Sequence, residues 1–135
     1  MVAVRAERAV SRHCLIIEDS AFDRKMMARV VQAVDRSLAV YAAGSLAEAR
    51  AVLQQGAVRI ILLDNNLPDG KGADFALELS RNVFLASIPI IMVSDWPSPF
   101  MWNKAESAGV RCVINKSDFN AETVSATFAQ LVAMH

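Results

Sequence analysis

The chain has 135 residues, of which 54% are hydrophobic, with 14 basic and 14 acidic residues and a formal net charge of +0. A chain of this length forms one domain with a sizeable core. The balanced charge argues against a nucleic-acid or acidic-lipid surface, which would need clustered positive charge. No apolar run is long enough for a membrane span, and the N-terminus lacks the continuous apolar stretch of a signal peptide. We therefore expect a cytoplasmic protein without nucleic-acid or membrane partners.

Several common binding sites have no signature in this sequence. Two cysteines and two histidines are too few for a zinc site at any familiar spacing. Cys14 and Cys112 both lie in apolar runs, so we expect buried thiols that behave as small hydrophobic residues. No G-x-G-x-x-G follows the first apolar run, and no G-x-x-x-x-G-K-[ST] occurs, so dinucleotide and P-loop binding are not indicated.

Apolar runs alternate with helical patterns along the chain after a tail at 1–11. The runs predict strands at 13–17, 38–42, 58–63, 89–93 and 110–114. Helices are predicted after Asp19 or Ser20, from the capping box that begins at Ser45 to Gly56, up to about Asn82, from Ser98-Pro99 to Gly109, and after Asn120. Five strands alternating with five helices predict an α/β fold with a doubly wound parallel sheet.

The first of these helices has the clearest periodicity. Its apolar residues recur at spacings of three and four, which predicts that they share the face turned to the core. They are Phe22, Met26, Met27, Val30, Val31 and Val34.

Polar residues follow the predicted strands at their carboxyl ends. Glu18 and Asp19 follow the first strand, Asp64 the third, Ser94 the fourth and Lys116 the fifth. Each has an ordinary structural explanation: an Asx turn, acids at a helix N-terminus, a turn hydroxyl or a solvated surface charge. Carboxyl ends of parallel strands share one edge, however, where ligands bind in open α/β sheets. Their coincidence at one edge favours a functional site.

Such a cluster has a definite chemistry. Three carboxylates at close range repel one another, and each pushes its neighbours toward the protonated form. A magnesium ion resolves this repulsion, since it prefers carboxylate oxygens and keeps open positions for a phosphate. Lys116 and Ser94 would then contact phosphoryl oxygens, and Asp64 would act as the nucleophile that forms an aspartyl phosphate. Phosphoryl transfer needs little beyond in-line positioning and neutralisation of charge.

The pattern Glu18-Asp19, Asp64-x-x-Leu67-Pro68-x-x-x-Gly72, Ser94 and Lys116 resembles the receiver domain of two-component response regulators. The resemblance extends from about Cys14 to the end, so we expect a receiver domain at 12–135. It implies a flavodoxin-like sheet of strand order 2-1-3-4-5. In that order the strands that carry Cys14 and Cys112 are not neighbours, which implies that no disulfide joins them.

The resemblance also implies the roles of the site residues. Asp64 would accept a phosphoryl group from a histidine kinase or a histidine phosphotransfer protein. Mg²⁺ would be held by Glu18, Asp19, Asp64 and the backbone carbonyl of Asn66, while Ser94 and Lys116 would contact the phosphoryl oxygens. The protein would not be an enzyme beyond its own phosphorylation and dephosphorylation. Its fourth helix, fifth strand and fifth helix would form the surface that signals to partners.

The sequence departs from the family pattern at three positions. Val113 stands where an aromatic residue is common, which puts the usual rotameric readout in question. Ser117 stands where proline is usual, so we predict a trans Lys116–Ser117 peptide, because a cis bond without proline costs about 2.5–4 kcal/mol. Asp95 stands where a small residue is usual, and we expect it to repel a phosphoryl group that the following Trp96 shields from water.

Aromatic residues also gather where the predicted fourth helix begins. Trp96 precedes it, and the consecutive Phe100, Met101 and Trp102 span too much of a helix's circumference to face inward together. We expect at least one to be exposed and to form, with Trp96 and Val113, a contact with a partner protein or a second copy of the chain.

We therefore interpret the chain as a single-domain receiver that signals through a downstream protein or passes its phosphoryl group onward. One alternative is a pseudo-receiver, a docking module that does not use phosphorylation. A less favoured alternative is a small phosphohydrolase with Asp64 as nucleophile. Such an enzyme would typically have a second acid two residues later, where this chain has Asn66.

Overall fold

The computed structural model describes residues 13–95 and 97–133 of the chain. Its main strands are β1 (His13–Ile17), β2 (Ala39–Ala43), β3 (Val58–Leu63), β6 (Ile90–Ser94) and β7 (Cys112–Asn115). Its helices are α2 (Ala21–Val34), α3 (Leu46–Gln54), α4 (Gly72–Ser80), α5 (Pro99–Ser107) and α6 (Ala121–Ala133). Smaller elements are the strands β4 (Asn66–Leu67) and β5 (Gly70–Lys71) and the 3-10 turn η1 (Lys116–Asp118).

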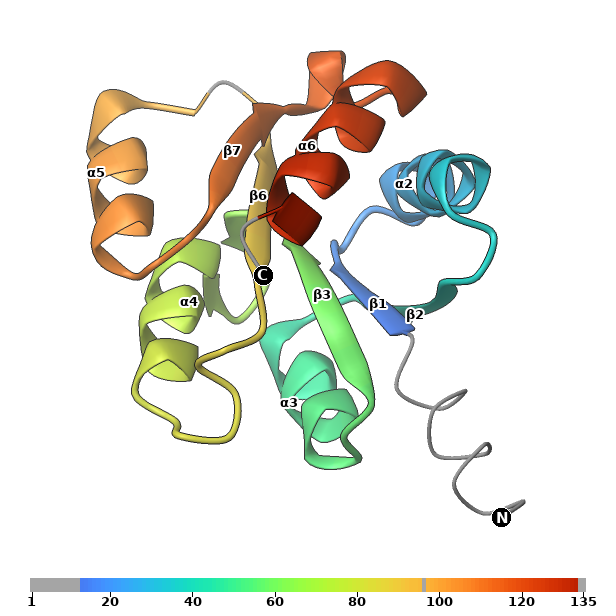
Figure 1. Cartoon of the computed structure of the whole chain (residues 1–135). Coiled ribbons are helices and arrows are strands. Elements are labelled where there is room, and N and C mark those ends of the chain that lie inside the picture. The colour runs from blue at the N-terminus through green and yellow to red at the C-terminus, as the bar shows by residue number, and fades with distance from the viewer. Residues whose placement is uncertain (1–12, 96, 134–135) are drawn as a thin grey trace, which may run out of the picture.

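The five main strands form one parallel sheet in the order β2-β1-β3-β6-β7 (Figure 1). In chain order this is 2-1-3-4-5, which confirms the predicted flavodoxin-like sheet. The carboxyl ends of the central strands therefore meet at one edge, because all strands run the same way. None of the described helices is long and apolar enough to cross a membrane.

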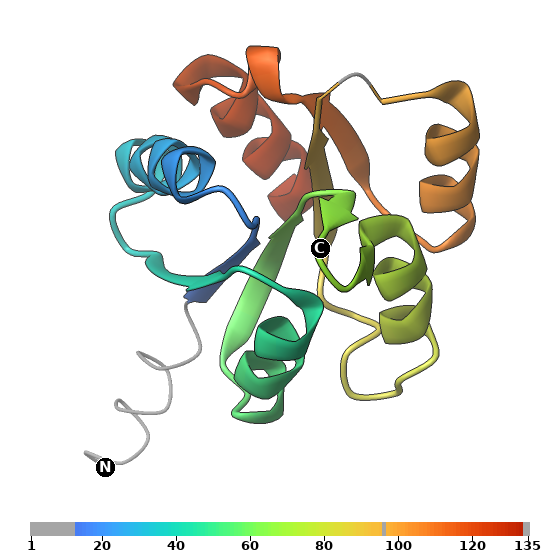
Figure 2. The same ribbon diagram turned by 180° about the vertical axis from the view of Figure 1, so that it is seen from behind.

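Helices cover both faces of the sheet. Alternate residues of β1 point to opposite faces, as the pleat of a strand requires. Cys14 and Ile16 pack toward α2 and α6, whereas Leu15 and Ile17 pack toward α3 and α4. Figures 1 and 2 show α2 and α6 side by side on one face and α3, α4 and α5 on the other. Burial on both faces explains the continuous apolar runs at 14–17 in β1, 60–63 in β3 and 90–93 in β6.

Side-chain caps fix where the helices begin. The backbone N–H groups of the first turns donate to Ser20 Oγ at 3.2 Å, Ser45 Oγ at 3.1 Å, Ser98 Oγ at 3.1 Å and Asn120 Oδ1 at 2.9 Å. Each bond satisfies a donor that the helix itself leaves free, so the predicted caps are confirmed. After α3, Gly56 has a φ of 79°, the left-handed conformation that glycine adopts readily at a helix end.

Two burial predictions were wrong. Phe22 is 80% exposed, because at 3.6 residues per turn it lies about 140° around α2 from the buried Met27, on the side turned away from the sheet. Cys112 is only half-buried, since it begins β7, the edge strand, and β7 begins there rather than at residue 110. Both cysteines are free thiols, as expected, and burial raises the pKa of Cys14 to about 12.

Candidate functional site

The structure brings the predicted site residues together at the carboxyl edge of the sheet. Glu18 and Asp19 follow β1 directly, Asp64 follows β3, Ser94 ends β6 and Lys116 follows β7. Backbone bonds between neighbouring strands fix two of these positions: Asp64 N–H donates to the Ile17 carbonyl at 3.0 Å, and Glu18 N–H to the Ala43 carbonyl at 2.9 Å. Residues that are far apart in the sequence therefore converge because the sheet order requires it.

Three carboxylates at this edge have the arrangement of a cation site. One oxygen from each of Glu18, Asp19 and Asp64 lies within 4.8 Å of the others. Glu18 and Asp64 are buried, whereas Asp19 is exposed, so the site is open to solvent on one side. A hard divalent cation fits this set, because it prefers carboxylate oxygens and retains water on its open side.

Lys116 lies among carboxylates and is itself only 11% exposed. Its ammonium forms an ion pair with Glu18 Oε1 and donates to Asp23 Oδ2 at 3.0 Å. It also lies 3.7 Å from Asp64 Oδ2 and 3.9 Å from Asp95 Oδ2. One cation therefore faces several anions, and the site holds an excess of negative charge.

Burial has the largest influence on the ionisation of these groups. Burial raises the pKa of Glu18 and of Asp64, although Lys116 and backbone N–H groups favour their charged forms. Burial would lower the pKa of Lys116, but hydrogen bonds to Glu18 and Asp23 and the charge of Asp64 outweigh it and raise that pKa. The lysine is therefore charged at neutral pH, whereas burial makes the charged forms of Glu18 and Asp64 less favourable than they would be in water.

The loop after Asp64 is held by its own hydrogen bonds. Asn65 N–H donates to Asp64 Oδ1 at 2.8 Å, and Asn65 Oδ1 accepts from Ala73 N–H at 3.1 Å. Gly72 N–H donates to the Asn65 carbonyl at 2.8 Å. A Cβ at Gly72 would collide with the backbone carbonyl of Asp64, so glycine is required for this close approach. Asp64 is thus presented by a tightly fixed turn.

Ser94 lies at the carboxyl end of its strand, as predicted, and Asn66 lies just beyond the carboxyl end of β3. Ser94 is 2% exposed, and its hydroxyl makes a long bond to the Asp95 carbonyl at 3.4 Å. Asn66 lies in the loop after Asp64, and its side chain accepts a hydrogen bond from Lys71 Nζ at 2.7 Å. The proposed role of the Asn66 backbone carbonyl stays a prediction.

The described residues include no cis peptide, which confirms the trans Lys116–Ser117 bond. The turn that carries Lys116 is held by Asn115, whose Oδ1 accepts from Ser117 N–H at 3.1 Å and from Ser117 Oγ at 3.0 Å. Side-chain capping therefore shapes the turn in a sequence that has no proline at this position.

Two further residues of the site, Asp23 and Arg24, were not predicted from the sequence. Asp23 is a direct partner of Lys116, and Arg24 Nη1 donates to the carbonyls of Glu18 at 2.8 Å and Asp19 at 3.0 Å. The available signal was the predicted cap at Ser20, which places both residues in the first turn of the helix that starts at this edge.

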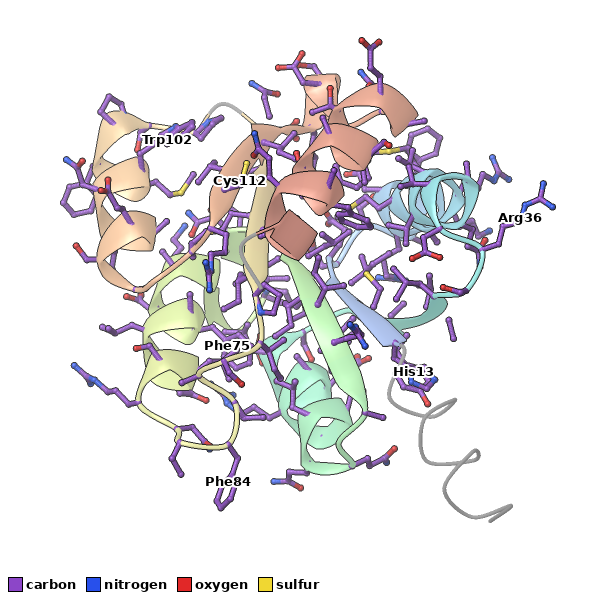
Figure 3. All side chains as sticks on the ribbon, viewed as in Figure 1. His13, Arg36, Phe75, Phe84, Trp102 and Cys112 are labelled. Carbon is purple, nitrogen blue, oxygen red and sulfur yellow. The ribbon has the colours of Figure 1, made fainter. Side chains whose placement is uncertain are left out.

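The aromatic cluster of α5 is split between core and surface. Met101 is buried, whereas Phe100 is 77% and Trp102 47% exposed, as the spacing predicted. Trp102 and the half-buried Val113 line a cavity of about 510 Å³ between α5, β7 and α6, and Figure 3 shows Trp102 and Cys112 on this side of the molecule. Trp96 lies outside the described residues. A role in partner binding stays a prediction.

Known proteins are similar to this chain in both sequence and fold. The sequence model of the response regulator receiver domain family matches residues 14–127 of this chain. The cyclic di-GMP phosphodiesterase response regulator RpfG of Xanthomonas campestris is 31% identical over 80 residues, which cover 59% of this chain and 21% of that protein. The transcriptional regulatory protein DpiA of Escherichia coli is 37% identical over 65 residues, covering 48% and 29%. The matches thus span less than a third of these curated relatives.

Solved structures agree with the family match. The chemotaxis response regulator CheY4 of Vibrio cholerae has a TM-score of 0.76 at 26% identity, covering 87% of this chain and 96% of that one. The signal receiver domain of a DNA-binding response regulator from Colwellia psychrerythraea has a TM-score of 0.82 at 18% identity, covering 90% and 98%, and shows the shared fold. The chain belongs to the response regulator receiver domain family.

Proposed function

We propose that this protein, through a receiver domain at residues 12–135, is a phosphorylation-dependent signalling switch. Asp64 accepts a phosphoryl group from a histidine kinase or a histidine phosphotransfer protein in a reaction that requires Mg²⁺. One observation carries this proposal: Asp64 is buried in a three-carboxylate site with Lys116 beside it, at the edge of the sheet where ligands bind.

Asp64 is the nucleophile in this proposal. A carboxylate oxygen of Asp64 forms a bond to phosphorus as the bond from phosphorus to the donor's histidine nitrogen breaks, and the electron pair of that bond leaves with the donor. The fixed turn from Asn65 to Gly72 holds the carboxylate in place, so little reorganisation is needed at the moment of transfer. Lys116, charged at neutral pH, and the Ser94 hydroxyl donate to the transferred oxygens.

Magnesium is the cation that this site would hold. Glu18, Asp19 and Asp64 supply carboxylate oxygens, and the carbonyl of Asn66 supplies a further ligand in our proposal. When bound, the ion neutralises charge on the carboxylates and on the phosphoryl oxygens. Support comes from a structural neighbour at 25% identity and a TM-score of 0.68, response regulator Rcp1, whose structure is described as the Mn²⁺-bound form.

The output surface in our proposal lies on α5 and β7. Trp102 is a large, exposed apolar side chain that lines the cavity between α5 and β7 together with Val113, and Phe100, two residues earlier on α5, is also exposed. Exposed aromatic residues of this kind are enriched at the centres of protein interfaces. With Trp96, they would contact a downstream protein or a second copy of this chain.

A constitutive docking module is the second candidate. It is favoured by the departures from the family pattern at Val113, Ser117 and Asp95. This candidate keeps the same partner surface but needs no chemistry at Asp64.

Incubation with acetyl phosphate and Mg²⁺, followed by intact mass measurement, distinguishes the two. The switch predicts one added phosphoryl group that does not form when EDTA removes the Mg²⁺ and that is absent in Asp64→Asn. The matched control is Asp74→Asn, which removes an exposed aspartate that pairs with Lys104 outside the site and should still react. A folded protein that accepts no phosphoryl group from acetyl phosphate or from a panel of histidine kinases would favour the docking module.

A further inference from the structure

Lys116 has a second strong partner that the chemistry of phosphoryl transfer does not require. Its ammonium lies 3.0 Å from Asp23 Oδ2, closer than the 3.7 Å that separates it from Asp64 Oδ2. Asp23 is in the first turn of α2, and its N–H donates to Ser20 Oγ at 3.2 Å, which fixes the start of the helix beneath it. The carboxylate is therefore held beside the lysine by a capped helix.

The ammonium of a lysine has three hydrogen-bond donors. In this structure they face Glu18, Asp23 and Asp64, with Asp95 more distant at 3.9 Å. A phosphoryl group on Asp64 would need one of these donors. The partners differ in how easily they could release the lysine, because Glu18 is 1% exposed, whereas Asp23 is 25% exposed and can be hydrated.

We infer that Asp23 is a positioning residue that competes with the phosphoryl group for the ammonium of Lys116. The inference rests on the proposed function and deepens it. In the resting protein Asp23 holds Lys116 toward α2, and on phosphorylation the lysine exchanges this contact for a phosphoryl oxygen. Asp23 thereby stabilises the unphosphorylated state and sets how readily the site accepts a phosphoryl group.

Asp23→Asn tests this competition, since it keeps the shape of the side chain and removes its charge. The measured quantities are the affinity for beryllofluoride, a phosphoryl mimic, in the presence of Mg²⁺ and the rate of phosphorylation by acetyl phosphate. Because a hydrogen bond between charged groups is lost only from the resting state, we expect both to rise about five- to tenfold. Asp23→Glu restores the charge within reach of Lys116 and should return both values toward those of the native protein.

Two further variants separate competition for Lys116 from general charge repulsion. Asp95→Asn removes a carboxylate that is 65% exposed and 3.9 Å from the ammonium, so its effect should be smaller. Asp118→Asn removes an exposed charge two residues beyond Lys116 that makes no ion pair among the described residues, so its effect should be smallest. Thermal unfolding of each variant checks that the fold is intact.

The inference is supported if the effect decreases from Asp23 to Asp95 to Asp118. It is overturned if Asp23→Asn behaves as the native protein, or if all three variants increase phosphorylation equally. A native protein that binds neither beryllofluoride nor a phosphoryl group would instead overturn the proposed function, and this inference with it. The two failures are therefore distinguishable.

Discussion

Two cations of this protein contact carboxylates in contrasting ways. Arg50 on α3 meets Glu78 on α4 through two hydrogen bonds of 2.9 Å, and its guanidinium lies 5.3 Å from the centre of the Phe75 ring. Both members of this pair are nearly half exposed. Lys116 is 11% exposed and faces carboxylates from the ends of β1 and β3 and from α2.

The difference lies in how the charges balance. In the surface pair, hydrogen bonds between the partners raise the pKa of Arg50 and lower that of Glu78, so each group stabilises the charged form of the other. At the sheet edge, burial raises the pKa of Glu18 and Asp64 despite the nearby lysine. The charges of Arg50 and Glu78 in the surface pair cancel. The edge cluster, in which Lys116 faces Glu18, Asp23 and Asp64, has an excess of negative charge that a divalent cation can neutralise.

Removing the cation of the edge cluster should have the largest effect on stability. Lys116→Met leaves Glu18 and Asp64 buried without a counter-charge, and we expect it to lower the free energy of unfolding by about 2–4 kcal/mol at neutral pH. The loss should shrink as the pH falls toward 5, because the carboxylates then bind protons and lose their charge. Urea denaturation at several pH values measures both effects, and a loss that does not depend on pH would contradict this account.

Removing a carboxylate from the same cluster should stabilise the protein. Burial raises the pKa of Asp64 in the folded state, so its ionisation opposes folding: the cost is absent below the unfolded pKa and grows as the pH rises through the folded pKa. Asp64→Asn should therefore raise the free energy of unfolding by about 1–2 kcal/mol at pH 8, or several degrees in Tm. The gain should vanish near pH 4, which calorimetry at the two pH values can check.

Binding of magnesium should offset the cost of the buried negative charge without any mutation. About 5 mM Mg²⁺ should raise the Tm of the native protein by an amount that corresponds to about 1 kcal/mol, if the ion binds the folded state with a dissociation constant near 1 mM. Asp64→Asn should lose most of this response because it lacks one of the three ligands. Equal shifts in the native protein and the variant would place the ion elsewhere.

The surface pair should contribute least. Arg50→Met keeps much of the aliphatic length of the side chain and removes the guanidinium with its contacts to Glu78 and Phe75. We expect the free energy of unfolding to fall by about 0.5 kcal/mol, and the fall to shrink in high salt. A loss as large as that of Lys116→Met would show that the two cations do not differ as proposed.

Much of this site could be predicted because it depends on short-range patterns. An apolar run that ends at Asp64 and is followed by turn residues gives both a strand and the end of that strand. Once five such runs are seen to be parallel, the residues at their carboxyl ends must share an edge. That reasoning placed Glu18, Asp19, Ser94 and Lys116 correctly.

The missed features depend on contacts that local patterns do not contain. Asp23 and Lys116 are 93 residues apart, and only the packed positions of α2 and β7 bring them together. Phe22 is four residues before Met26, but successive steps of four drift around the helix, and Phe22 falls off the face that Met27 buries. Both errors occur at the same place, the start of α2 beside the site.

The central claim, that Asp64 accepts the phosphoryl group, can be tested at the residue itself. The phosphorylated protein would be treated with borohydride, which reduces an aspartyl phosphate to homoserine, and its peptides read by tandem mass spectrometry. The account predicts homoserine at position 64, formed only when Mg²⁺ and the phosphodonor are both present. Homoserine at Asp19, Asp23 or Asp95 instead, or at no aspartate in a protein that carries the added phosphoryl mass, would contradict it.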